Sequence, residues 1–253
     1  MKNDYKNIAK KVIELEIKGL KKLRRFINSS FNKAVEVIAN CQSKIIIAGV
    51  GKSGLIASKI ASTFSSVGTP AFSISASDCS HGDLGSITRK DVLILISNSG
   101  NSDELKNIIQ YANRYKIKLI SIVSKKNSLL YKAADIKLLL PEVEEAGYGI
   151  VPTSSTSVQL SIGDALAISL MNYKKFSKLD FKKFHPAGSL GKKLKTVEDL
   201  MLIENKIPFI NENDTIKKGL KIINLKKLGV LIARNRKLNT TGIYTDGDIK
   251  RTI

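Results

Sequence analysis

Five short apolar segments, separated by stretches long enough for a helical or loop crossover, organise the first half of the chain. They lie at 44–48, 71–75, 91–96, 118–123 and 136–140. Apolar runs of this length are typical of strands buried on both faces, and their alternation with crossovers predicts βαβ units. The sequence therefore predicts an α/β fold in which a parallel sheet forms the middle of three layers, with helices on both faces.

Helical periodicity precedes and follows these segments. Residues 4–27 and 31–38 carry apolar side chains at mostly helical spacing, which predicts N-terminal helices that precede the sheet. The span 150–173 contains Asp164 as its one charged residue. We interpret this span as a buried helix and not as a membrane span, because it opens with a run of Ser and Thr.

The pattern changes after Gly191, which predicts a domain boundary. We expect N-terminal helices over 1–43, a sheet domain over 44–191, a linker over 192–196 and a small α+β unit over 197–253. A unit of that size is expected to fall short of independent stability.

Lysine and arginine outnumber acidic residues by 42 to 22, which gives a formal net charge of +20. The lysines are scattered along the whole length, and no aromatic-interleaved basic patch or nucleic-acid motif accompanies them. We therefore expect neither a nucleic-acid nor a membrane partner, although the positive field would help to recruit an anionic substrate. Two cysteines without disulfide or metal-ligand spacing, and an N-terminus unlike a signal peptide, predict a cytoplasmic protein.

The first apolar segment ends in a glycine turn, GVGKSG at 49–54, that leads into a predicted helix. Backbone N–H groups at such a helix start form a ready anion site. The glycine spacing matches the dinucleotide fingerprint, but the second strand ends in Ser and Ala where that site needs an acidic residue. Lys52 and Ser53 imitate a P-loop, but Ile46 stands where the first P-loop glycine belongs.

A second polar turn, SNSGNSDE at 97–104, follows the third apolar segment. The hydroxyls of Ser97, Ser99 and Ser102 surround its glycine, and the start of the next predicted helix adds N–H donors. Ser102 by itself would indicate only a helix N-cap. Since one sugar phosphate would use both turns, we expect them to hold it together, with Lys52 nearby.

Candidate acid–base groups lie in the remaining loops. The chain has two histidines, His81 and His185, and both lie in glycine-rich loops, which favours acid–base work over an incidental surface position. Glu145 follows the fifth apolar segment, and Glu104 lies in the first turn of its helix. A solvated charge run is the structural alternative for the neighbouring Glu142 and Glu144, and a dipole-favoured carboxylate is the alternative for Glu104.

Six motifs, taken in order, resemble those of the arabinose 5-phosphate isomerases, which are sugar isomerase (SIS) domain enzymes. The motifs are GVGKSG at 49–54, SHGDLG at 80–85, SNSG at 97–100, PTSST at 152–156, GDALA at 163–167 and HPAGSLG at 185–191. The resemblance implies reversible conversion of D-ribulose 5-phosphate to D-arabinose 5-phosphate through an enediol, the entry to 3-deoxy-D-manno-octulosonate for bacterial lipopolysaccharide. It also implies a homotetramer that needs no cofactor or metal.

The same resemblance assigns site residues. It places the substrate phosphate on Ser53, Ser97, Ser99 and Ser102, and the catalytic positions on Lys52, His81, Glu104, Glu145 and His185. We favour His81 for the proton transfer between C1 and C2, with Glu145 as the rival base. Glu104 would orient its neighbours, and Lys52 would neutralise the phosphate or the enediolate. The family tends to offer the loop of His185 across a subunit boundary.

The tail contains GIYTDGD at 242–248, which resembles one cystathionine-β-synthase (CBS) repeat. Two such repeats usually follow the isomerase domain, so we expect the second to be absent and this one to pair between subunits or to be a remnant. Another departure is the pair Gly147 and Tyr148, which replaces the family's Cys-Pro after Glu-Ala. Two alternatives stay open: a sugar-phosphate-binding regulator without turnover, although no DNA-reading helix-turn-helix is found, and a nicotinamide oxidoreductase.

Overall fold

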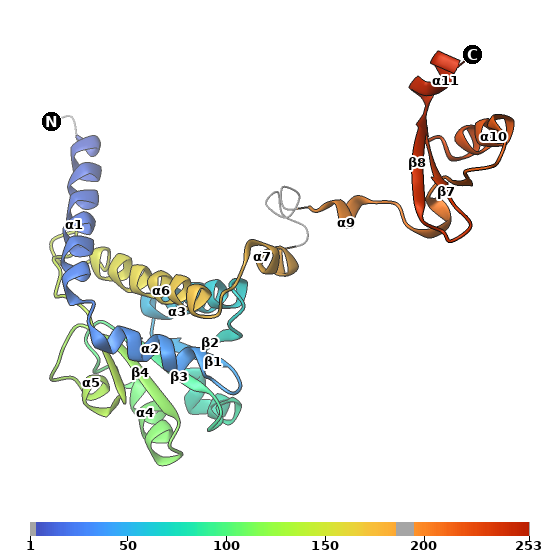
Figure 1. The fold of residues 1–253 in the computed structure, drawn as a ribbon. Helices are drawn as coiled ribbons and strands as arrows, with labels where there is room; N and C mark the ends of the chain where they lie inside the picture. Colours follow the sequence, from blue (N-terminus) through green and yellow to red (C-terminus); the bar gives the residue numbers. More distant parts are fainter. Residues whose placement is uncertain (1–3, 186–194, 253) are drawn as a thin grey trace. The chain divides into compact units, whose positions relative to one another are not determined.

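The structure is a computed structural model, and it describes residues 4–185 and 195–252 (Figure 1). The chain divides into two compact units, Met1–Lys192 and Lys193–Ile253. Most of the HPAGSLG motif and of the predicted linker lies outside the described residues, so the exact domain boundaries stay predictions.

A five-stranded parallel sheet with the strand order β2-β1-β3-β4-β5 forms the centre of the larger unit. Its strands are β1 (Ile45–Gly49), β2 (Ala71–Ser75), β3 (Val92–Ser97), β4 (Lys118–Val123) and β5 (Ile136–Leu139). Each lies at one of the five apolar segments. The predicted fold class, a parallel sheet between two helical layers, is confirmed.

Helices cover both faces of this sheet. One face carries α2 (Ser29–Ala39), α3 (Lys52–Ser66) and α6 (Ser154–Tyr173), and α1 (Tyr5–Phe26) packs on α6. The other face carries α4 (Glu104–Arg114), α5 (Leu129–Ala133) and the two 3-10 turns η1 (Asp78–His81) and η2 (Asp83–Ser86). The short helix α7 (Lys178–Phe184) follows α6. Because side chains alternate along a strand, Ile45 and Ile47 enter one core and Ile46 and Ala48 the other.

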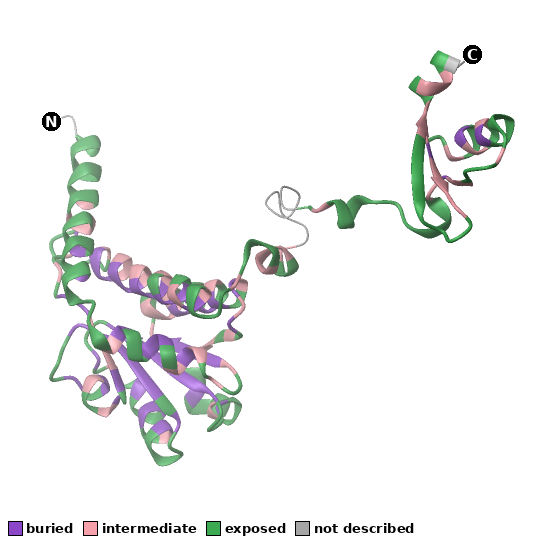
Figure 2. Ribbon diagram, in the orientation of Figure 1, coloured by how far each residue is buried: buried purple, intermediate pink, exposed green. Residues whose placement is uncertain are grey.

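Figure 2 shows the middle strands buried and α1 exposed along most of its length. The helix predicted over 150–173 is confirmed from Ser154 onward, but residues 146–151 form a tight turn closed by a bridge between Ala146 and Val151. One side of α6 is buried, and the other side carries exposed residues such as Ile168. Among the described residues, no helix has both the length and the apolar character needed to cross a membrane.

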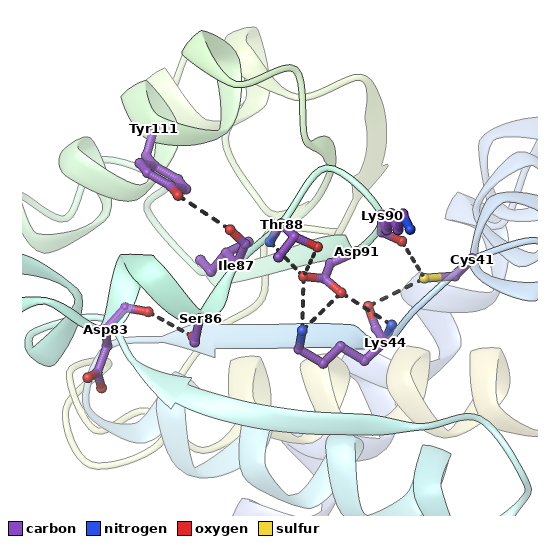
Figure 3. Close-up of polar contacts among 9 residues, drawn as sticks. All are labelled: Cys41, Lys44, Asp83, Ser86, Ile87, Thr88, Lys90, Asp91 and Tyr111. Carbon is purple, nitrogen blue, oxygen red and sulfur yellow. Dashed lines mark hydrogen bonds and ion pairs between the residues drawn. The ribbon is translucent and has the colours of Figure 1, made fainter.

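A buried carboxylate closes the amino edge of the sheet, where β1 and β3 begin. The Asp91 side chain is fully buried and accepts the Lys44 ammonium at 3.1 and 3.2 Å, the Thr88 N–H at 2.7 Å and the Thr88 hydroxyl at 2.9 Å (Figure 3). Burial alone would raise the pKa of Asp91, but hydrogen bonds from Thr88, Ser43 and Lys44 outweigh burial and lower that pKa. Asp91 therefore ties the starts of two neighbouring strands together.

The second unit contains a three-stranded sheet with the order β6-β7-β8. Its elements are α9 (Val197–Leu200), η3 (Glu204–Lys206), β6 (Phe209–Asn211), α10 (Ile216–Lys226), β7 (Val230–Arg234), β8 (Thr240–Thr245) and α11 (Asp246–Thr252). In the described part of this unit, Ile223 and Leu231 are the buried aliphatic side chains, so its core is thin. The predicted small α+β unit is confirmed and is compatible with a CBS-like fold.

Candidate active site

The direction of chain travel across the sheet reverses beside β1. From β1 the chain moves outward to β2 and then returns to the opposite side of β1 as β3. Open α/β sheets bind ligands outside the carboxyl ends of the strands at such a switch point. Gly49 at the end of β1 pairs with Ile96 near the end of β3, so the two polar turns predicted to share a phosphate lie side by side.

The structure explains why each of the three positions in the first turn is a glycine. A Cβ on Gly49 would lie 2.7 Å from the backbone carbon of Ser53, and a Cβ on Gly54 would lie 2.9 Å from the Gly49 oxygen. The end of β1 and the first turn of α3 therefore touch through backbone atoms. Gly51 has a φ of +56°, which side-chain-bearing residues rarely adopt, and the space where its Cβ would stand is open. This open space adjoins the helix start, where a ligand would approach.

Helices α3 and α4 both begin beside this switch point, and neither N-cap residue forms a side-chain cap. Within the described residues, the N–H groups of Gly51 and Lys52 have no acceptor. Lys52 is the exposed first residue of α3, and its ammonium contacts no hydrogen-bond or ion-pair partner in that part of the chain. Uncapped N–H groups, two helix dipoles and a cation are the features on which anion-binding sites are built, and they make this the candidate phosphate site.

The turn after β3 supplies hydroxyls to the same place. Ser97 is 5% exposed, and its Oγ accepts the Gly100 N–H at 3.0 Å and lies 3.4 Å from the Ser102 Oγ. Ser99 is exposed on the same turn. Gly100 has a φ of +70°, and a Cβ there would lie 2.3 Å from the Ser128 Oγ, so the turn is packed tightly against the segment after β4. The hydroxyls thus lie on a closely packed turn.

Helix α6 begins nearby, but a carboxylate of the chain itself caps it. The Glu145 Oε2 accepts the N–H groups of Thr153 at 2.9 Å and Ser155 at 3.2 Å, and lies 3.4 Å from the Thr153 hydroxyl. Burial alone would raise the pKa of Glu145, but hydrogen bonds from Ser155 and Thr153 outweigh burial and lower that pKa. These donors at α6 are therefore already occupied, unlike the N–H groups at the start of α3.

Helix α6 also contacts the glycine turn through Gln159. This residue is 1% exposed, and its Oε1 accepts the Ser53 hydroxyl at 3.1 Å. At the far end of α6 the Lys174 ammonium donates to the Thr69 hydroxyl at 2.9 Å, so α3 and α6 run side by side in the same direction. The cap made by Glu145 lies one helical turn before Gln159, which places this carboxylate beside the space above the glycine turn.

His81 ends η1 in the loop after β2 and is exposed. The amide of Asn107 on α4 donates to the hydroxyl of Ser80 at 3.1 Å, which holds the His81 loop against α4. Glu104 is exposed and lies one turn before Asn107, and residues three apart lie on the same side of a helix. The His81 loop and Glu104 therefore lie along the same side of α4.

His185 lies at the opposite end of the unit. The Phe184 ring before it stacks on Phe176 with 5.9 Å between centroids, and a Cβ on Gly68 would lie 2.6 Å from the Phe176 ring. Gly68 follows the end of α3, a helix of 15 residues that begins at Lys52. At 1.5 Å per residue, about 21 Å separate the two ends of this helix. His185 is therefore remote from Lys52 of its own chain.

The structure brings most of the predicted site residues to the carboxyl edge and leaves His185 outside. Those at or around the switch point are Lys52, Ser53, His81, Ser97, Ser99, Ser102, Glu104 and Glu145. Sequence reasoning missed Gln159, whose signal is a glutamine among small and apolar residues on the buried side of α6. It also gave no role to Thr153 and Ser155. In residues 4–185 and 195–252, no group of three or more His, Cys, Asp or Glu side chains could hold a metal ion.

Comparison with known proteins agrees with this architecture. The SIS domain family matches residues 38–169. The arabinose 5-phosphate isomerase KdsD of Yersinia pestis is 41% identical over 99% of this chain and 77% of that protein, and the KdsD of Francisella tularensis subsp. tularensis is 43% identical over 97% and 76%. The solved structure of E. coli CFT073 c3406 in complex with arabinose 5-phosphate is 37% identical, with a TM-score of 0.71, and covers 74% of this chain and 100% of that one. The chain therefore belongs to the SIS domain family and, within it, to the family of the arabinose 5-phosphate isomerases.

Proposed function

We propose that the chain is an isomerase that interconverts D-ribulose 5-phosphate and D-arabinose 5-phosphate through an enediol. The observation that carries this proposal is the meeting of two uncapped helix starts beside Lys52 at the switch point of the sheet. The KdsD relatives and the arabinose 5-phosphate bound to c3406 support the choice of sugar phosphate. In a cell, this reaction would supply 3-deoxy-D-manno-octulosonate for lipopolysaccharide.

The phosphate in this proposal binds the first-turn N–H groups of α3 and α4 and the hydroxyls of the serine turn. A phosphate held in this way fixes the other end of a short sugar, so that binding energy orients C1 and C2. Lys52 then balances the charge of the phosphate or of the enediolate. Such a preorganised cation acts most strongly where water is excluded.

The aldose–ketose shift moves one proton between C1 and C2 and one between their oxygens. We assign the carbon proton to His81, whose loop is anchored on α4 through Ser80. Glu145 is a weaker candidate, because its donors hold it ionised and lower its pKa, which makes it a poorer base. Its proposed role is to cap the start of α6 beside the switch point, while Glu104 orients its neighbours. Since every step moves only protons, the proposal includes no cofactor.

We further propose that a second copy of the chain completes the site with its own His185. Ile8 and Ile13 on α1 are 57% and 56% exposed, and Ile168 on α6 is 53% exposed. Asp164, the one charged residue of α6, pairs with Lys59 of the same chain. In a chain with a net charge of +20, a helix without lysine or arginine favours contact with another copy. We place the subunit contact on α1 and α6, with a tetramer as the expected assembly.

The experiment that tests the activity is incubation of the pure protein with D-ribulose 5-phosphate, followed by NMR. We expect signals of D-arabinose 5-phosphate to appear without any added nucleotide, and His81→Ala to abolish most of the turnover while the melting temperature stays unchanged. Binding of the sugar phosphate without turnover would favour a regulator. A folded protein that neither binds nor converts the compound would reject the proposal.

A mixing experiment tests the shared site. Lys52→Ala and His185→Ala each remove one part of the site, so each variant alone should be nearly inactive. If each site takes Lys52 from one subunit and His185 from another, equal random mixing with free subunit exchange leaves about a quarter of the sites with both residues, and so restores about a quarter of wild-type activity. Activity that stays at the sum of the two single variants, with subunit exchange demonstrated by mass spectrometry, would place His185 in its own chain's site or outside any site.

A further inference from the structure

Gln159 is a buried polar residue to which the proposed reaction assigns no role. It lies on the inner side of α6 among Val158, Ile162 and other buried residues, and it is 1% exposed. A buried amide costs free energy unless it is hydrogen-bonded. Its partner is the hydroxyl of Ser53, a residue in the first turn of α3. A buried amide is thus aimed at the turn that is proposed to bind phosphate.

The hydroxyl of Ser53 cannot serve the amide oxygen and a phosphate at the same time. A serine hydroxyl has a single hydrogen, and in the observed arrangement it is donated to the Gln159 Oε1 at 3.1 Å. Phosphate oxygens accept and do not donate, so they require that same hydrogen. A half-turn of the amide group about its last bond resolves the conflict. The amide nitrogen then donates to the Ser53 oxygen, and the hydroxyl hydrogen becomes free for the phosphate.

We propose that Gln159 is a positioning residue that switches Ser53 from donating within the protein to donating to the substrate phosphate. An amide suits this task because it offers an acceptor and a donor of nearly equal shape. A carboxylate would accept only, and an apolar side chain would do neither. The inference rests on the proposed sugar-phosphate function and adds to it the group that controls one phosphate donor.

Two variants of similar shape test the switch by steady-state kinetics with D-ribulose 5-phosphate. Gln159→Glu holds the Ser53 hydrogen and adds a negative charge beside the phosphate, so we expect KM to rise about tenfold or more with little change in kcat. Gln159→Met leaves the Ser53 hydroxyl free to donate but removes the amide that orients it. We expect this variant to raise KM about threefold. Gln110→Glu, which makes the same charge change on the exposed side of α4, is the matched control and should leave KM unchanged.

The pH dependence separates a donor switch from a structural effect. Once protonated, the introduced carboxyl group can again donate to Ser53, so the KM ratio of Gln159→Glu to wild type should shrink as the pH is lowered from 8 towards the pKa of that group. In a Ser53→Ala background, Gln159→Met should have no further effect on KM, because the hydroxyl that Gln159 is proposed to control is absent. This test can be made even if Gln159→Glu folds poorly. Inorganic phosphate as a competitive inhibitor should show the same order of weakening.

The outcomes separate this inference from the function on which it rests. If wild type converts the substrate but Gln159→Glu has a KM within twofold of it, the switch is rejected and the function stands. A parallel fall of kcat and melting temperature without pH dependence would also reject the switch, since that result indicates a packing role. If folded wild type does not turn over, the proposed function fails.

Discussion

Strand β1 has a lysine just outside each end, and the two lysines have opposite surroundings. Lys44 at the amino edge is 29% exposed and contacts both oxygens of the fully buried Asp91 (Figure 3). Lys52 at the carboxyl edge is exposed and contacts no charged partner among the described residues. The same residue type therefore closes a network at one edge and stays open to a ligand at the other.

The contrast extends to the backbone. At the amino edge, a backbone N–H and a hydroxyl of Thr88 are turned inward to Asp91, so polar groups satisfy one another. At the carboxyl edge, α3 and α4 begin without a side-chain cap. Unpaired donors beside a cation do little for stability until an anion arrives, and a ligand that binds only the folded state stabilises it by mass action. We infer from this contrast that the amino edge serves folding, and that the carboxyl edge serves the proposed binding.

Exchanging each lysine for methionine should give the largest contrast. Lys52→Met removes the cation from the proposed enediolate site, so we expect kcat/KM to fall about a hundredfold or more, with the unfolding free energy changed by less than about 0.5 kcal/mol. Lys44→Met should lower stability and leave kcat/KM near that of wild type. The measurements are steady-state kinetics and urea unfolding at one fixed protein concentration.

The proposed contrast between the two edges is rejected if the two variants exchange their effects on kcat/KM and stability, or if both variants show the same effects. A Lys52→Met protein with wild-type kcat/KM would show that the open edge is not the catalytic edge. A Lys44→Met protein that loses turnover while it keeps its stability would show that the amino edge takes part in the chemistry.

The Asp91 cluster itself should give the largest stability effect. Asp91→Ala leaves the Lys44 ammonium and the Thr88 donors without their acceptor, and we expect unfolding to become easier by about 3 kcal/mol. The control is Asp135→Ala, because Asp135 pairs with Lys118 and accepts the Leu119 N–H at 2.8 Å at the same edge but is 43% exposed. Its ion pair is expected to contribute less than about 1 kcal/mol. Urea unfolding measures both, and equal losses would remove the distinction between buried and exposed pairs.

The elements and the two turns could be predicted from the sequence because their signals are local. Apolar runs mark the strands, and glycine at 49, 51 and 54 reflects backbone contact and a positive φ within six residues. The Asp91 cluster could not be predicted, since Lys44 and Asp91 are 47 residues apart and meet only through the register of β1 on β3. The place of His185 depends on the length and direction of α6. Gln159 was missed because a buried polar residue has no periodic signal.

Glu145 allows a smaller test at the carboxyl edge. Because its folded-state pKa is lowered, its charge stabilises the fold above the pKa of an unfolded glutamate, and that stabilisation is lost as the pH falls through the folded value. We expect Glu145→Gln to destabilise the protein by about 1 kcal/mol at pH 7, as for a lost helix cap. The difference from wild type should shrink at pH values below about 4. An equal difference at both pH values in urea unfolding would show that the charge of Glu145 does not stabilise α6.

The smallest expected effect concerns the two cysteines, of which Cys41 lies near the amino edge of the sheet and Cys79 near its carboxyl edge. Cys79 lies two residues before His81 and is 1% exposed, and burial, with the nearby Asp83 and Asp78 carboxylates, raises its pKa to about 11. At pH 8 only about one thiol in a thousand is then ionised. Cys41, near the amino edge, is partly exposed and lies 3.4 Å from two backbone oxygens. We expect iodoacetamide to modify Cys41 well before Cys79 in the native protein, with both modified at similar rates in urea, as followed by peptide mass spectrometry. Faster modification of Cys79 would show that the His81 loop opens readily without substrate, and arabinose 5-phosphate should then slow it.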